Sequence, residues 1–299
     1  MKFRKLNFEK EINTKLQKVI QVNESDVYFI AGMHDSGLKS LTKKCYRFNL
    51  RNRTVERIAN TLVVRSGFGI CNIGTKIYIM GGNQQGSLNS NQVYDIDENK
   101  WQAFVQLPIT LISPTAVVFQ NRFIYLIGEF TTARNQDAMS EILRIDTYKG
   151  QEEMKWETIQ IKQDDQENWL QNICQFSIID LGLLYPNETT QDEIQLLLFG
   201  GLHRLRSTSS ELYHIKIIHN GDEEQQVLNV EITKIQDKNL TINDRFQYNQ
   251  WLALENTRDC KDWFMFGIFG GHFIKFPQSI NNLQDIEIES REDLGYMNL

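Results

Sequence analysis

The stretch from Ile77 to Trp101, IYIMGGNQQGSLNSNQVYDIDENKW, decides the fold of this chain. An apolar run ends in a glycine doublet, a polar loop follows, and two further short runs carry Tyr94 and Trp101. Glycine after a strand permits positive φ and close approach of another backbone, and large aromatic side chains fill the space between packed sheets. The stretch therefore predicts consecutive antiparallel strands that pack against neighbouring sheets.

The same pattern, an apolar run that ends in small residues, recurs five times along the 299 residues. At the second small residue of each copy the intervals are 50, 47, 72 and 70 residues, and polar inserts account for the two long ones. Repeats of about 40–50 residues are typical of arrays of four-stranded sheets, each of which needs neighbours to cover both faces. The residues at this second position are Gly32, Gly82, Glu129, Gly201 and Gly271, so the third copy has Glu where the others have Gly.

The second copy, with its glycine doublet followed by VYDIDENKWQ at residues 93–102, closely resembles the Kelch repeat. The other copies are more degenerate, although the first keeps Tyr46 and the fourth keeps Gly201 and Tyr213. Five phased copies cover nearly the whole chain, which therefore resembles Kelch-repeat proteins. The resemblance implies an all-β fold, a β-propeller of four-stranded antiparallel blades with five visible repeats and either five or six blades. The strong bias toward Asn and Gln is typical of an AT-rich genome such as that of a protist.

We predict that residues 1–299 form one propeller, with four strands, A to D from the axis outward, in each blade. In the second blade these strands are expected at 67–73, 76–82, 91–96 and 101–105, and in the fifth at 247–254, 263–270, 272–276 and 284–289. Residues 1–14 are a candidate for a strand that closes the ring. The predicted blades are 15–60, 61–107, 108–163, 164–237 and 238–299.

Composition narrows the class of partner. An apolar fraction of 41% suffices for a core, and a net charge of −6 with a pI near 5.5 argues against nucleic acid, because phosphate binding needs clustered Lys and Arg. No apolar run is long enough to insert into a membrane. The four cysteines lie far apart without a C-x-x-C motif, which favours a reducing, cytoplasmic location, with a cytoskeletal or ciliary site as the finer expectation.

Loop charges point to one face of the predicted propeller. Antiparallel strands place the A–B and C–D loops at one end of each blade and the B–C and D–A loops at the other. The acidic inserts fall in the first set, and several arginines fall in the second. In Kelch proteins partner peptides often bind the B–C/D–A face, and arginine pairs well with carboxylates. We predict that another protein, through an acidic or polar peptide, contacts Arg65, Arg134, Asn135, His203, Arg204, Arg206 and His272.

Three histidines, His34, His203 and His272, follow glycine doublets and are expected in B–C loops. Three imidazoles could bind a metal, but loop histidines beside a glycine turn are the simpler interpretation. We therefore predict no metal and no cofactor.

The favoured function is a non-catalytic protein-interaction scaffold, or a subunit of a larger complex, that binds its partner through loops of one propeller face. The chain contains no G-x-S-x-G, H-E-x-x-H or P-loop motif, so we predict that it is not an enzyme. Two alternatives stay open. One is a Kelch-fold enzyme of the metal-oxidase or sugar-isomerase type. The other is a structural subunit of a cytoskeletal or ciliary assembly, with exposed apolar loops such as residues 62–64 as its contacts.

Overall fold

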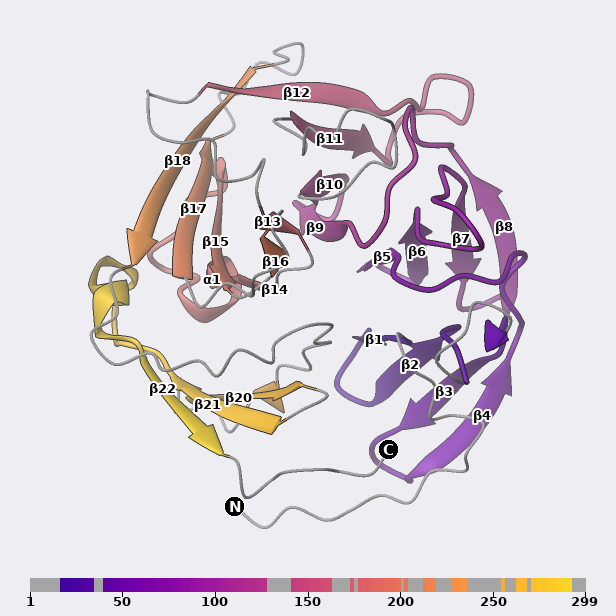
Figure 1. Cartoon of the computed structure of the whole chain (residues 1–299), viewed down its shortest axis with the longest axis horizontal. Coiled ribbons are helices and arrows are strands. Elements are labelled where there is room, and N and C mark those ends of the chain that lie inside the picture. Colours follow the sequence, from indigo (N-terminus) through magenta and orange to yellow (C-terminus); the bar gives the residue numbers. More distant parts are fainter. Residues whose placement is uncertain are drawn as a thin grey trace. The chain divides into compact units, whose positions relative to one another are not determined.

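The structure is a computed structural model of the chain (Figure 1). The chain forms two compact units, Met1–Ile112 with Leu299, and Ser113–Asn298, here called unit 1 and unit 2. The residues that the structure describes are 17–34, 40–127, 141–162, 173–174, 177–199, 202–203, 212–218, 227–235, 254–255, 262–267 and 270–291. The predicted ring-closing segment, residues 1–14, lies outside them.

Unit 1 contains two antiparallel four-stranded sheets in which each strand pairs with the next along the chain. The first sheet consists of β1 (Lys18–Gln21), β2 (Asp26–Ile30), β3 (Cys45–Asn49) and β4 (Thr54–Ile58). The second consists of β5 (Gly69–Ile73), β6 (Lys76–Met80), β7 (Asn91–Asp95) and β8 (Lys100–Phe104). The four strands of the second sheet begin and end within two residues of the predicted positions.

Burial explains why the inner strands of each sheet have more apolar sequences than the outermost strand. In β6 every residue after Lys76 is buried, so both faces of this strand are covered and its sequence is a continuous apolar run. In the outermost strand of the first sheet, β4, residues Thr54–Arg57 are exposed, and three of the four are polar. The repeat is therefore strongest in its inner strands and weakest in its outer ones.

Aromatic side chains join the two sheets of unit 1. Tyr28 of the first sheet packs with Tyr94 of the second at a ring separation of 6.2 Å, and Tyr94 packs with Trp101 at 5.0 Å. The Trp101 indole Nε1 donates a 2.9 Å hydrogen bond to the carbonyl of Ala59. The conspicuous Tyr and Trp of the second repeat thus lie between sheets, as predicted, and belong to one buried cluster.

The glycine doublet of the second repeat is required by close backbone contact. Gly81 and Gly82 have φ of +62° and +103°. A Cβ on Gly81 would lie 2.7 Å from the carbonyl oxygen of Leu111, and one on Gly82 would lie 2.8 Å from that of Ser66. Any larger residue would therefore push the incoming and outgoing connections away from the sheet.

Unit 2 holds an eight-stranded sheet made of two four-stranded halves. One half is β9 (Thr115–Phe119), β10 (Phe123–Ile127), β11 (Glu141–Asp146) and β12 (Glu157–Lys162). The other is β14 (Ser177–Asp180), β15 (Glu193–Phe199), β17 (Leu212–Ile218) and β18 (Val227–Ile235). The outer strands β12 and β18 pair in parallel, with Ile161 opposite Leu228. The sequence did not predict this junction.

A further four-stranded sheet in unit 2 is β19 (Leu254–Glu255), β20 (Asp262–Gly267), β21 (Gly270–Lys275) and β22 (Glu287–Arg291). The prediction of a strand over 284–289 is wrong at its start, because the 3-10 helix η3 (Ile280–Asp285) comes first, with the Ser279 hydroxyl accepting from the Asn281 N–H at 3.2 Å. The sequence also did not predict the helix α1 (Leu181–Leu184) or the pairing of β13 (Ile173–Cys174) with β16 (Leu202–His203).

Two apolar clusters stabilise unit 2. One lies between the two halves of the eight-stranded sheet and contains Tyr125, Leu196 and Ile215. The other packs Leu197 and Tyr185 against Phe276 and against Leu283 of η3. In the described residues, no helix combines the length and the apolar character that crossing a membrane requires.

Candidate partner-binding surface

The connections of unit 1 lie at two opposite ends of its sheets. The connections β2–β3, β4–β5 and β6–β7 and the segment after β8 share one end, because neighbouring strands are antiparallel. We call this end the B–C face of unit 1. Its described residues are 31–34, 40–44, 59–68, 81–90 and 105–112.

Charge separates the two ends of unit 1. The described residues of the B–C face include Lys43 and Lys44 but no Asp or Glu. In the described part of unit 1 the acidic residues lie at the other end, except Glu56, which is within β4. The residues at the other end are Glu24, Asp26, Asp95, Asp97 and Glu98. The described part of the B–C face of unit 1 is therefore cationic and suited to an anionic partner.

Leu62 is the most exposed apolar side chain of this face, with 45% of its surface accessible. Its backbone is nevertheless held on both sides. The Leu62 N–H donates to the side-chain oxygen of buried Gln92 at 2.8 Å, and the Leu62 carbonyl accepts from Lys43 Nζ at 2.7 Å. An apolar side chain held rigidly in solvent can act as an anchor for a partner without the entropy cost of ordering a loop.

The polar loop between β6 and β7 is also ordered by its own hydrogen bonds. The side-chain oxygen of Asn83 accepts from the N–H groups of Gln85 and Gly86 at 3.1 and 3.0 Å. The Ser87 hydroxyl donates to that of Thr110 at 2.9 Å. This loop presents the exposed amide of Gln85 on the same face, and amides both donate and accept hydrogen bonds.

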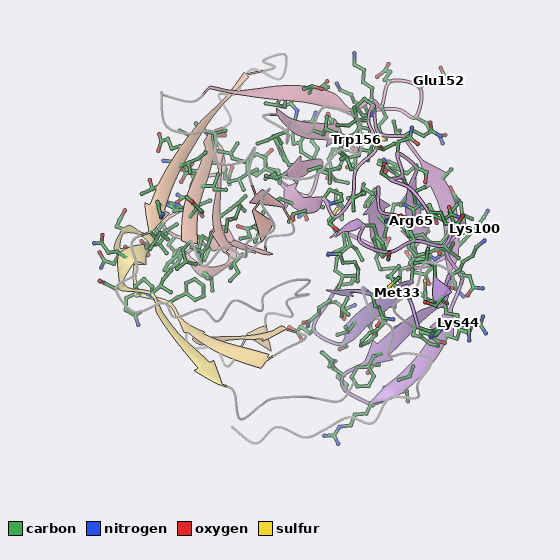
Figure 2. All side chains as sticks on the ribbon, in the orientation of Figure 1. Met33, Lys44, Arg65, Lys100, Glu152 and Trp156 are labelled. Atoms are coloured by element: carbon green, nitrogen blue, oxygen red, sulfur yellow. The ribbon has the colours of Figure 1, made fainter. Side chains whose placement is uncertain are left out.

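Arg65 lies beneath this face rather than on it. Its side chain is fully buried, and Nη1 donates to the carbonyls of Gly81 and Ser90, each at 2.8 Å. Burial lowers the pKa of Arg65 to about 10, so the group stays charged near neutral pH. Figure 2 shows Arg65 among the side chains of the second sheet. The expectation that Arg65 itself touches a partner needs correction, because its guanidinium is enclosed and holds the loops in place.

The other predicted contacts are only partly described. Arg134, Asn135, Arg204 and Arg206 lie outside the described residues. His203 lies in strand β16 rather than in the loop expected for it, and His272 lies in β21, which overlaps the strand predicted at 272–276. In the described part of the chain, no three His, Cys, Asp or Glu residues are grouped as a metal site would need.

Lys43 and Lys44 were missed as contacts because the sequence placed both in a strand of the first blade, whereas the structure begins that strand, β3, at Cys45. The proximity of Lys43 to Leu62 is seen only in the structure.

Comparison with known proteins supports the repeat. The Kelch motif family model matches residues 65–107. Kelch-like protein 40 of Xenopus tropicalis is 28% identical over 145 residues, which are 46% of this chain and 23% of that protein. Kelch-like protein 11 of Homo sapiens is 24% identical over 143 residues, 47% of this chain and 19% of that protein. The matched segments span less than a quarter of the length of these relatives.

A solved structure extends the fold to most of the chain. The structure of YjhT matches with a TM-score of 0.56 and 12% identity, covering 93% of this chain and 79% of that one. The sheets and this match define an all-β propeller fold with four or more four-stranded blades. The family model shows a Kelch motif at residues 65–107, and nearly half of the chain is similar to Kelch-like proteins. The predicted blade boundaries stay a prediction.

Proposed function

We propose that this chain is a non-catalytic scaffold that holds an acidic or polar segment of another protein against the B–C face of unit 1. The observation that carries the proposal is Leu62, an exposed apolar side chain whose backbone is fixed between Lys43 and Gln92. Protein interfaces concentrate their affinity in a few such anchors, with polar groups around them supplying specificity.

Charge indicates the chemistry of the partner. Lys43 donates to the carbonyl of the anchor residue Leu62, Lys44 follows it in the chain, and the described residues of the same face include no Asp or Glu. A carboxylate of the partner would also meet the amides of the β6–β7 loop. The partner segment should therefore combine acidic residues with one apolar residue that contacts Leu62.

The contacts that the sequence predicts in unit 2 are a separate part of the proposal. Arg134, Asn135, Arg204 and Arg206, with His203 and His272, stay proposed contacts, whereas Arg65 supports the surface from below. The alternatives, a Kelch-fold enzyme and a cytoskeletal or ciliary subunit, make different predictions. Stoichiometric metal in the purified protein would favour the enzyme.

The proposal is tested by selecting binders from a random peptide library displayed on phage and measuring their affinity by fluorescence anisotropy. Selected peptides should be enriched in Asp and Glu next to an apolar residue. The variants Leu62→Asp and Lys43→Glu with Lys44→Glu should each weaken binding by about tenfold or more. The matched control, Lys76→Glu with Lys100→Glu, changes exposed lysines at the opposite end of unit 1 and should leave affinity nearly unchanged. Binding that ignores Leu62 and both loop lysines would refute the proposal.

A further inference from the structure

The outer strand of the first sheet, β4, offers a backbone edge. It pairs with β3 on its inner side and with no other strand in the described part of the chain. Residues Thr54–Arg57 are all exposed. An exposed outer strand of this kind is a template for an added strand unless the protein blocks it.

Apolar surface gathers along the same strand. In the described residues four large apolar side chains are markedly exposed, and two of them, Leu50 and Val55, lie in β4 or in the turn before it, with 38% and 39% of their surface accessible. Val55 is directly opposite Phe48 of β3, which is buried at 5% exposure. Val55 thus extends the apolar face formed by Phe48 to the solvent-exposed edge of the sheet.

The charges around β4 are almost all positive. Arg51, Arg53 and Arg57 are exposed, and Glu56 is the one acidic residue between Leu50 and Ile58. Arg51 pairs with Glu24 at 3.1 Å, whereas the structure shows no carboxylate partner for Arg53 or Arg57 among the described residues. Two copies of β4 would place arginines against arginines, so this edge disfavours self-pairing and selects an acidic strand.

The net charge of unit 1 as a whole also favours an acidic partner. Residues 1–112 contain 16 Lys and Arg and nine Asp and Glu, a formal charge of +7, whereas residues 113–299 contain 16 and 29, a formal charge of −13. The net charge of −6 therefore conceals a basic unit 1. Such a field raises the encounter rate with acidic partners.

Outer edges in this fold do accept extended segments. In unit 2, outer strand β12 pairs in parallel with β18 through residues 160–162 and 227–229. An outermost strand of one four-stranded group can thus hydrogen bond to chain outside that group.

We propose that the outer edge of β4 is a second docking surface, distinct from the B–C face, and that it takes an extended acidic segment of a partner protein as an added strand. Backbone hydrogen bonds along β4 supply affinity. Arg53, Val55 and Arg57 lie on one face, because side chains alternate between the faces of a strand. Acidic side chains at every second position of the added segment therefore meet the two arginines.

Three fluorescent octapeptides test this on the unmodified protein: alternating Glu-Val, alternating Lys-Val, and alternating Glu-Pro. Glu-Val should bind at least about tenfold more tightly than Lys-Val, because only the former complements the arginines. Glu-Pro has the same charge but lacks every second N–H, so it should also bind about tenfold more weakly if a strand is formed. Equal binding of Glu-Val and Glu-Pro would overturn the proposal, because charge alone would then explain the affinity.

Variants then locate the site. Arg53→Glu with Arg57→Glu should weaken Glu-Val binding by about tenfold or more, whereas the control Lys76→Glu with Lys100→Glu, with the same change in charge, should alter it less than about threefold. Circular dichroism melting checks that each variant is folded. If Lys43→Glu with Lys44→Glu abolishes Glu-Val binding while the β4 variant does not, the peptide binds the B–C face and the β4 proposal fails while the proposed function stands.

Discussion

The guanidinium of Arg65 donates a 2.8 Å hydrogen bond to the carbonyl of Gly81, so a buried cation fastens the connection before the second sheet to that sheet's glycine doublet. Backbone hydrogen bonds also fasten the connection after each sheet of unit 1 to the glycine at the end of that sheet's second strand. Gly32 N–H donates to the carbonyl of Arg65 at 3.3 Å, and Gly82 N–H donates to that of Leu111 at 2.7 Å. Arg65 and Leu111 thus occupy equivalent positions, and both are buried.

This equivalence leads to a prediction on stability. Arg65→Ala removes the donors to two carbonyls, those of Gly81 and Ser90, and should lower the free energy of unfolding by about 2–4 kcal/mol. Urea unfolding followed by tryptophan fluorescence measures the change. The control Arg51→Ala, at a side chain 73% exposed, should stay within about 0.5 kcal/mol of the parent protein. Similar small effects for both variants would contradict a structural role for Arg65.

The glycine doublet gives a second prediction, with a control in the same sheet. Gly82→Ala places a Cβ 2.8 Å from the Ser66 carbonyl oxygen at φ +103°. Gly74→Ala, at φ +55°, meets no atom within 4 Å and should cost only about 1–2 kcal/mol for the left-handed backbone. Gly82→Ala should lower the free energy of unfolding by clearly more, because steric overlap adds to the strain. If both variants lowered the free energy of unfolding equally in urea titrations, the backbone at Ser66 would be able to move away from the added Cβ without further loss of stability.

The sequence predicted the features that depend on local pattern. Buried inner strands appear as continuous apolar runs, as in β6, and the contacts of Gly82, Tyr94 and Trp101 follow from the repeat. The sequence could not predict the β12–β18 pairing, because it joins segments that lie far apart in the chain and belong to different repeats. Arg65 was misplaced because a charged residue in a predicted loop is usually exposed. Only its equivalence to the apolar Leu111 indicated burial.

A third prediction concerns acid. Burial alone would raise the pKa of the Asp146 carboxyl, but hydrogen bonds from Arg122 and from the Tyr148 N–H outweigh it and hold the pKa below the usual value of 3.8. A carboxyl with a depressed folded pKa stabilises the fold above its unfolded pKa, and this contribution is lost as the pH falls through the folded value. Asp146→Asn should therefore cost more stability near pH 7 than near about pH 3. Urea titrations at both pH values measure the difference, and a pH-independent cost would exclude this linkage.

A fourth prediction concerns the thiols. Cys45 is fully buried, and burial raises its pKa to about 12, although hydrogen bonds at Ala31 and Thr61 partly oppose the shift. Cys71 is also buried, and burial raises its pKa further. Because the thiolate is the reactive form, neither residue should react with iodoacetamide in the folded protein at mildly alkaline pH. Both should react fully in urea. Peptide mapping by mass spectrometry reads each cysteine separately, so the test does not depend on Cys174 or Cys260. Rapid native labelling of Cys45 would mean that β3 opens readily from the first sheet, and the rigid support inferred for Lys43 and Leu62 would then be lost as well.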